Sequence, residues 1–289
     1  MNFILAIILI FFIFLIGIMP FFILYFFSDL MYVFLYRIFG YRKKVVYNNL
    51  SLSFPKTEKL ELKRLMGLSY KNLTDVLVEG IKGFTMTDSQ IRKRHKILNP
   101  EIIESFYKEG KSVIALPTHY GNWEWGALSP GLFVQDINVV GFYKPLSNPF
   151  VDRFMRKNRS RTGTTLVSIY ETPRIFERLK NKPTIYIMAA DQSPSNPNKS
   201  YWVDFLGRNT AFLHGPEKYA RQHDIPLVYV EIQRVKRGYY ELTLSMLAEN
   251  PTELEEGEIT KRYAKMLESQ ISRKPENWLW SHRRWKLTR

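Results

Sequence analysis

The stretch that decides the fold runs from Ser112 to Glu124 and reads SVIALPTHYGNWE. Its first part, up to Leu116, is a short apolar run typical of a buried strand. Pro117 ends that run, and a polar segment with His119 follows. In open α/β sheets ligands bind at the carboxyl ends of strands. The sequence therefore predicts that His119 faces a crevice instead of the core.

Glu124 follows His119 by five residues, so on one continuous helix the two side chains would point apart. Gly121 tolerates unusual backbone angles and Asn122 can cap a following helix, so together they predict a turn. Across that turn we expect the Glu124 carboxylate to reach the imidazole, fix its tautomer and leave the other nitrogen as a base for a hydroxyl group. The alternative, which the spacing alone favours, is that His119 only caps the helix and Glu124 is exposed.

Further apolar runs alternate with helical patterns along the middle of the chain, which predicts the α/β class with a mostly parallel sheet flanked by helices. The expected strands are Ser112–Leu116, Asn138–Tyr143, Thr164–Ile169, Thr184–Ala190, Leu227–Val235 and Tyr239–Met246. The expected helices are Thr57–Phe84, Asn148–Arg161, Thr172–Lys180, Gly215–Gln222 and Glu258–Ile271. The last two strands predict a hairpin at Arg237-Gly238.

Residues 1–28 carry no charged side chain and are mostly Ile, Leu and Phe, enough to cross a bilayer core of roughly 30 Å. We expect a transmembrane anchor over 1–28 and one catalytic domain over 29–289. A cleaved signal peptide fits less well, because no basic stretch precedes the apolar run and no small-residue cleavage site follows it. Pro20 could instead end the helix and leave Phe21–Phe39 as an amphipathic stretch at the interface.

The first basic residues after this run are Arg37, Arg42, Lys43 and Lys44. By the positive-inside rule they place the domain on the cytoplasmic side of the inner (plasma) membrane, as a single-pass protein. The 42 basic and 27 acidic residues give a net charge of +15. All of these charged residues lie outside residues 1–28, and their positive excess favours binding to a surface of anionic lipid. Nucleic-acid binding is not expected, since no zinc spacing or RNA-binding motif is present.

The chain of 289 residues contains no cysteine, which excludes disulfides, thiolate metal sites and a cysteine nucleophile. We expect no metal and no cofactor. A basic run over residues 92–96 is more typical of a solvated face than of a site.

Four blocks in order carry a family resemblance: YRKKVV at 41–46 with Asn49-Leu50 and Phe54-Pro55; HYGNWE at 119–124; Tyr143-Lys144-Pro145 with Asn148-Pro149, Arg159 and Gly163; and Asp191-Gln192 with Phe205-Leu206-Gly207. The ending PENWLWSHRRWK at 275–286 is similar as well. The chain resembles the lauroyl and myristoyl acyltransferases of lipid A biosynthesis, the late acyltransferases of Gram-negative bacteria. The resemblance implies a glycerolipid acyltransferase fold and an acyl thioester donor, either acyl carrier protein or coenzyme A.

Carried over to this chain, the resemblance makes His119 the general base and Glu124 its orienting partner. Five residues are candidates for substrate binding: Asn148, Arg156, Arg159, Arg161 and Asp191. The arginines could hold phosphates of the acceptor or the donor, because guanidinium groups bind phosphate in bidentate fashion, or they could simply be solvated. Asp191 follows a strand and could orient substrate or cap a turn.

The expected reaction transfers an acyl chain to a hydroxyl of a lipid A precursor at the bilayer. Two alternatives stay open: an acyltransferase for another polar lipid, such as a phosphoinositol mannoside or an aminolipid, and a non-catalytic membrane-bound binding protein.

Overall fold

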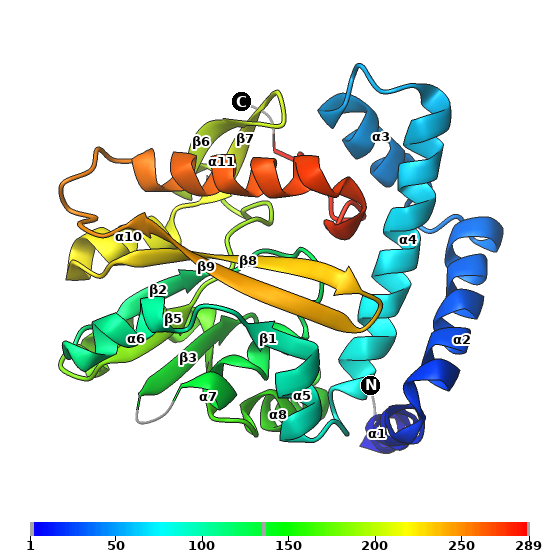
Figure 1. Cartoon of the computed structure of the whole chain (residues 1–289), viewed down its shortest axis with the longest axis horizontal. Coiled ribbons are helices and arrows are strands. Elements are labelled where there is room, and N and C mark those ends of the chain that lie inside the picture. The colour runs from blue at the N-terminus through cyan, green and yellow to red at the C-terminus, as the bar shows by residue number, and fades with distance from the viewer. Residues whose placement is uncertain (1–2, 135–136, 288–289) are drawn as a thin grey trace.

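A seven-stranded sheet crosses the centre of the chain in the order β1-β9-β8-β2-β5-β3-β4 (Figure 1). The structure is a computed structural model that describes residues 3–134 and 137–287. Neighbouring strands are parallel except β8 and β9, which form an antiparallel hairpin. The strands of this sheet are β1 (His95–Ile97), β2 (Val113–Leu116), β3 (Asn138–Tyr143), β4 (Thr164–Ser168), β5 (Thr184–Ile187), β8 (Leu227–Lys236) and β9 (Tyr239–Ala248).

Helices cover both faces of the sheet and one side of the molecule. The α-helices are α1 (Phe3–Ile18), α2 (Phe21–Tyr32), α3 (Lys43–Ser53), α4 (Lys59–Lys82), α5 (Asp88–Arg94), α6 (Glu101–Lys108), α7 (Pro130–Phe133), α8 (Pro149–Ser160), α9 (Thr172–Arg178), α10 (Gly215–His223) and α11 (Glu258–Arg273). Short helical turns are η1 (Val33–Ile38), η2 (Trp125–Ala127), η3 (Ile169–Glu171), η4 (Pro197–Lys199) and η5 (Pro275–Asn277).

The predicted α/β class is confirmed, and every predicted strand and helix of the middle region is present within a few residues of its expected ends. Three strands, β1, β6 (Ser200–Phe205) and β7 (Arg208–Leu213), were missed, and the helices α3, α5, α6 and α7 were not predicted either. Strand β1 begins within the basic run at 92–96, and its His95 is fully buried and pairs with β9. A separate antiparallel pair, β6 and β7, turns at Leu206 and Gly207, both with positive φ.

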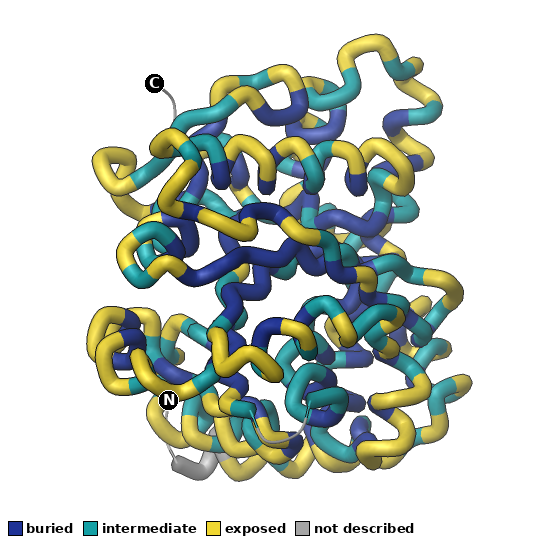
Figure 2. The backbone as a smooth tube through the Cα atoms, turned by 60° about the vertical axis from the view of Figure 1, so that its left-hand side comes forward, coloured by how far each residue is buried: buried dark blue, intermediate teal, exposed yellow. Residues whose placement is uncertain are grey.

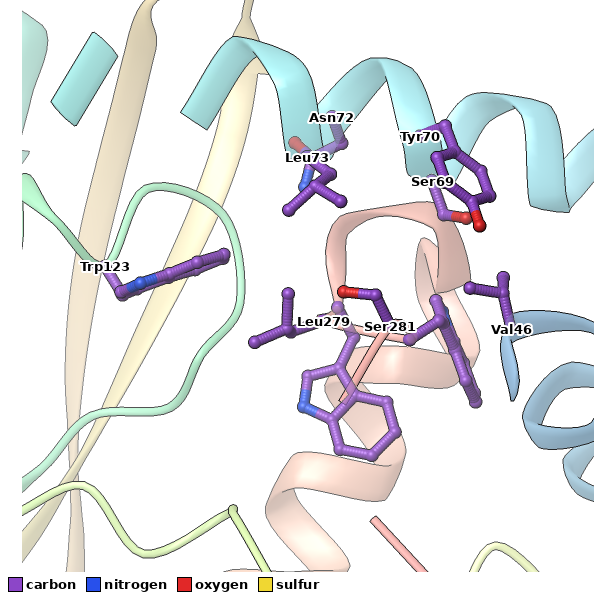
Figure 3. Close-up of a pocket in the computed structure, with 10 residues that line it drawn as sticks. Val46, Ser69, Tyr70, Asn72, Leu73, Trp123, Leu279 and Ser281 are labelled. Atoms are coloured by element: carbon purple, nitrogen blue, oxygen red, sulfur yellow. The ribbon is translucent and has the colours of Figure 1, made fainter. Parts of the chain in front are cut away.

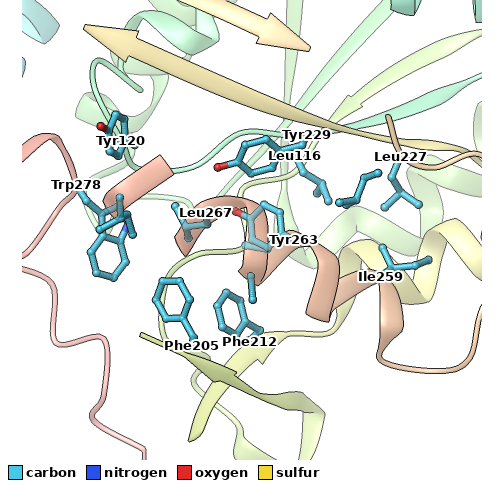
Figure 4. Close-up of a cluster of buried hydrophobic side chains, with 14 of the residues drawn as sticks. Leu116, Tyr120, Phe205, Phe212, Leu227, Tyr229, Ile259, Tyr263, Leu267 and Trp278 are labelled. Atoms are coloured by element: carbon cyan, nitrogen blue, oxygen red, sulfur yellow. The ribbon is translucent and has the colours of Figure 1, made fainter. Parts of the chain in front are cut away.

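Strand β2 is buried on both faces, as expected for a central parallel strand. Ile114 and Leu116 join a core beneath α11, whereas Val113 and Ala115 join a second core on the opposite face. Figure 4 shows part of the first core, where Tyr263 and Leu267 of α11 lie between the sheet and the aromatic rings of the β6–β7 pair. Along the backbone, buried positions concentrate in the strands and exposed ones on the outer helices (Figure 2). The sheet therefore gives a rigid base for the loops at its strand ends.

The described part of the apolar amino-terminal segment forms two helices and not the single helix expected over residues 1–28, and the anchor itself stays a prediction. Helix α1 ends at Ile18, and α2 begins at Phe21 with Pro20 at its N-cap. Proline lacks a backbone N–H and fixes φ, so the break falls where the alternative interpretation placed it. The described segment Phe21–Ile38 is long and apolar enough to cross a membrane, while Ile7–Ile18 is a shorter apolar helix.

Helix α2 lies along α4 on one side and is exposed on the other (Figure 1). On the inner side Tyr25 donates a hydrogen bond to Glu79 at 2.8 Å and Ser28 donates one to Asp75 at 2.7 Å. The exposed large apolar residues of the segment Phe21–Ile38 are Phe22, Phe26, Phe27 and Leu30 of α2, followed by Val33, Phe34 and Ile38 of η1. One face of this segment is thus packed against α4 and the other is apolar and exposed.

Candidate active site

His119 and Asp191 meet at the carboxyl ends of two neighbouring strands. His119 lies three residues beyond β2 and Asp191 four residues beyond β5, and the two strands pair in parallel. The pairing extends past β5, since the Met188 amide donates to the Ala115 carbonyl at 3.0 Å. His119 Nδ1 lies 2.7 Å from Asp191 Oδ1, and the His119 backbone N–H donates to Asp191 Oδ2 at 2.9 Å. Sheet topology therefore brings together residues that are 72 positions apart.

Asp191 is a buried carboxylate with several donors aimed at it. Besides the two contacts from His119, Trp278 Nε1 donates to Asp191 Oδ2 at 3.0 Å. Burial alone would raise the pKa of Asp191, but the charge and hydrogen bonds of His119, with Trp278, bring it down to about 2. Asp191 is therefore ionised at neutral pH and accepts a hydrogen bond from the N–H at His119 Nδ1.

The imidazole of His119 is held by Asp191 and is still accessible. Its side chain keeps 22% of its surface exposed, against 1% for Asp191. Within residues 3–134 and 137–287 no hydrogen bond is made to His119 Nε2. Burial acts to lower the pKa of His119, but the charge and hydrogen bond of Asp191, with a smaller effect of Glu124, outweigh it and raise the pKa above its usual value. With Nδ1 protonated, Nε2 is the nitrogen that can accept a proton.

Glu124 does not make the contact to His119 that we expected, because Asp191 occupies that position. The Glu124 carboxylate instead accepts a hydrogen bond from Arg159 Nη2 at 2.7 Å. The turn explains the difference: Gly121 takes a φ of +62°, and the chain beyond it carries Glu124 against Gly80 of α4. The structure thus joins two of the predicted site residues, Glu124 and Arg159, in an ion pair whose side chains are 29% and 25% exposed.

Asn122 fixes the turn between His119 and Glu124. Its side-chain oxygen accepts from the Trp125 amide at 2.9 Å, so the predicted cap is present. The helix expected to follow is only the single turn η2. The Asn122 carbonyl lies 3.1 Å from His95 Nε2, and its side-chain nitrogen donates to Glu79 at 2.7 Å. The missed strand β1 therefore supports the turn between His119 and Glu124 directly.

Glu79 connects this turn with the amino-terminal segment. Its carboxylate is fully buried and accepts hydrogen bonds from Asn122, from Tyr240 of β9 at 2.8 Å and from Tyr25 of α2. Burial raises the pKa of Glu79 to about 7, against the opposing effect of the two tyrosine hydrogen bonds. One acidic side chain of α4 thus holds both the turn between His119 and Glu124 and α2.

The remaining predicted residues have structural partners of their own. Asn148 is the N-cap of α8, where its side chain accepts from the amides of Phe150 and Val151. Arg161 donates to the carbonyls of Gly83 and Met86, which ties the end of α8 to the segment after α4.

Arg156 lies on α8 near Tyr143, whose hydroxyl donates to Asp152 at 2.9 Å. Substrate binding by Asn148, Arg156 and Arg161 stays a prediction.

The carboxyl-terminal segment contributes two side chains next to the pair that sequence analysis left out of the site. Trp278 binds Asp191, and His282 Nε2 accepts from the Ser193 amide at 3.0 Å. Burial lowers the pKa of His282 to about 4, so it is neutral near pH 7. The sequence feature that could have indicated these two residues is the ending PENWLWSHRRWK at 275–286, which is part of the family resemblance.

Trp123 forms one wall of a small apolar pocket beside His119. Its indole ring lies 5.6 Å from the imidazole, measured between ring centroids. Figure 3 shows the ring on its loop, facing Leu73 of α4 and Leu279 of the carboxyl-terminal segment. The pocket has a volume of only about 10 Å³, room for about one water molecule. No group of three or more His, Asp or Glu side chains suited to a metal ion occurs among the described residues.

Comparison with known proteins places the whole chain in a family. The chain is 24% identical to the lipid A biosynthesis palmitoleoyltransferase of Escherichia coli (strain K12) over 248 residues, 85% of this chain and 79% of that protein. It is also 24% identical to the lipid A biosynthesis lauroyltransferase of the same strain and 21% identical to a lipid A biosynthesis acyltransferase of Haemophilus influenzae, over 85% of this chain and 79% and 78% of theirs. The model of the bacterial lipid A biosynthesis acyltransferases matches residues 2–287, and the chain therefore belongs to that family of acyltransferases.

Proposed function

We propose that His119 is the general base that activates a hydroxyl of a lipid A precursor for attack on an acyl thioester. The observation that carries the proposal is the hydrogen bond between His119 Nδ1 and Asp191, which leaves Nε2 accessible at the carboxyl end of β2. A neutral imidazole oriented by a buried carboxylate is the arrangement used to deprotonate alcohols in other enzymes.

The proposed reaction needs no acyl-enzyme. His119 Nε2 takes the proton of the acceptor hydroxyl while its oxygen attacks the thioester carbonyl. The carbon–sulfur bond then breaks, an ester forms, and the proton on Nε2 passes to the leaving thiolate. Asp191 stays ionised and stabilises the imidazolium between these two proton transfers. The donor is an acyl carrier protein or coenzyme A thioester.

Arg159 is the residue on α8 that we assign to anion binding in this reaction. Its side chain is 25% exposed and its guanidinium is held at one nitrogen by Glu124, so the other nitrogens remain for a phosphate of donor or acceptor. Glu124 then acts by holding Arg159 in place. Its charge also helps to raise the pKa of His119.

The exposed apolar face of α2 and the net charge of +15 support a place at an anionic membrane surface. Together with the basic residues after the apolar segment, they favour the inner membrane with the catalytic domain on the cytoplasmic side.

The test is acyl transfer from labelled acyl carrier protein to a tetraacylated lipid A precursor that bears Kdo sugars, followed by mass spectrometry. Wild type should transfer, and His119→Ala should lose at least about 100-fold in rate. If neither protein transfers to this acceptor, a phosphoinositol mannoside and an aminolipid are tried next. Equal rates for both proteins would contradict the assignment of His119 as the general base.

A further inference from the structure

A basic groove lies apart from the catalytic pair, where α2, α4, the β8–β9 turn and η5 meet. Its volume is about 420 Å³, much larger than the pocket beside Trp123. Five cationic side chains line it against three carboxylates. The cations are Lys71, Arg234, Lys236, Arg237 and Lys274, and the carboxylates are those of Asp29, Asp75 and Glu276. We call this site the basic groove.

The two arginines of the basic groove are neutralised within the protein. Asp75, with 3% of its side chain exposed, accepts from Arg234 at 2.5 Å and from Arg237 at 2.6 Å. Arg237 also binds Asp29 of α2 at 2.8 Å. Two of the three carboxylates are therefore already paired with arginines. This ion-pair network forms a fixed wall that joins α2 to α4 and the β8–β9 turn.

The three lysines are not neutralised in this way. In the part of the chain that the structure describes, none of them forms a salt bridge. All three are exposed. Lys71 lies 5.5 Å from the ring centroid of Tyr32, and Lys236 lies 4.3 Å from that of Tyr239, so aromatic rings orient two of the ammonium groups. The basic groove thus presents uncompensated positive charge from three separate elements.

We infer that the basic groove binds the phosphate group of an anionic lipid. Lysine ammonium groups bind phosphate as point charges, and three of them around one opening suit a dianionic or monoanionic phosphate. The lipid nature of the ligand follows from α2, which supplies Asp29 to the groove wall and exposes Phe22, Phe26 and Leu30 on its outer side. A phosphate in the groove would have its acyl chains beside that apolar face.

The basic groove is connected to the turn between His119 and Glu124 through η5. The Tyr120 hydroxyl donates to the Lys274 carbonyl at 2.9 Å, and the Gly121 amide donates to the Asn277 carbonyl at 3.0 Å. Because the groove adjoins this turn, the phosphate can be that of the acceptor lipid. Because the groove also adjoins the exposed face of α2, the phosphate can equally be that of a bilayer phospholipid. The first source rests on the proposed function, whereas the second does not.

The test uses full-length protein in a non-ionic detergent and a groove variant, Lys71→Gln/Lys236→Gln/Lys274→Gln. A matched control, Lys180→Gln/Lys182→Gln/Lys265→Gln, removes three exposed lysines elsewhere and changes the net charge equally. Calorimetry measures binding of dihexanoyl phosphatidylglycerol, with dihexanoyl phosphatidylcholine as the neutral probe. We expect wild type and control to bind the anionic probe alike, more weakly as salt rises, and the groove variant to bind it at least tenfold more weakly.

Acyl transfer in the same detergent, free of phospholipid, identifies the source of the phosphate. A KM for the acceptor that rises in the groove variant with kcat unchanged identifies the acceptor's own phosphate. An unchanged KM together with lost phosphatidylglycerol binding identifies a bilayer phospholipid. Equal binding of the anionic probe by groove variant and control, or no binding by wild type, would overturn the inference. The calorimetry measures lipid binding without acyl transfer. A protein that binds phosphatidylglycerol in the basic groove but transfers no acyl chain would therefore contradict the proposed function and not this inference.

Discussion

His119 and Asp191 are joined by two hydrogen bonds, one from the imidazole Nδ1 and one from the backbone amide, to the two oxygens of a single carboxylate. The backbone contact fixes the position of the loop, and the side-chain contact fixes the ring and its tautomer. A carboxylate that holds both is better placed to orient the base than Glu124, which binds Arg159. The histidine of the HYGNWE motif therefore takes its partner from another strand.

The ion pair between Glu124 and Arg159 predicts coupled effects on catalysis. Loss of either charged hydrogen bond should lower kcat/KM by roughly 10- to 100-fold, for Glu124→Gln and for Arg159→Gln. If Glu124 acts through Arg159, the double variant should be no worse than the poorer single variant. Steady-state kinetics of the four proteins measures this. Fully multiplicative losses would show that Glu124 acts on the reaction independently of Arg159.

The positive φ of Gly121 predicts that the turn tolerates no side chain. An added Cβ would lie 3.0 Å from Ile232 Cγ2, and the left-handed conformation itself costs an L-residue roughly 1–2 kcal/mol. Gly121→Ala should therefore lower the melting temperature and displace His119, with a large fall in kcat.

Gly110 gives a matched control for this substitution, because its φ is +72° and an added Cβ meets no atom within 4 Å. Gly110→Ala should have a similar backbone cost and unchanged kcat. Equal kcat values for the two variants would contradict a special role of the Gly121 turn.

The buried carboxylate of Glu79 predicts a pH-dependent contribution to stability. Its pKa is raised to about 7, above the value near 4.5 expected when unfolded, so its contribution is full at low pH and is lost as pH rises from about 4.5 through 7. Glu79→Gln should remove that slope. It should also destabilise by roughly 1–3 kcal/mol, because an amide cannot accept from all three donors.

Thermal melts of wild type and Glu79→Gln in detergent at pH 5 and pH 8 measure this difference. Burial lowers the pKa of His95 to about 3, so the unfolded chain gains a proton there as pH falls through the ordinary histidine range, but this effect is common to both proteins and cancels in the comparison. A wild-type melting temperature with the same pH dependence as the variant would show that Glu79 does not titrate in this range.

Much of the fold was predictable because its strands are short apolar runs separated by clear helical patterns. Strand β1 was missed since His95 and Lys96 look like a solvated basic run, and only burial against β9 makes them a strand. His119 was predictable from its place after β2. Its partner was not, because the predicted turn and the family resemblance both pointed to Glu124, whereas the contact to Asp191 depends on β5 lying beside β2 in the sheet.

The most direct test of the account is the pH profile of kcat/KM for wild type, Asp191→Asn and Glu124→Gln. In wild type the rate should rise with pH through an apparent pKa above 6.5, because the base must be neutral and Asp191 raises its pKa. Asp191→Asn should lose roughly 10³- to 10⁴-fold, as in other histidine–carboxylate pairs, and move the inflection to lower pH. Glu124→Gln should lose far less and shift the inflection only slightly. A larger loss and a larger shift in Glu124→Gln than in Asp191→Asn would contradict the assignment of Asp191 as the partner of His119.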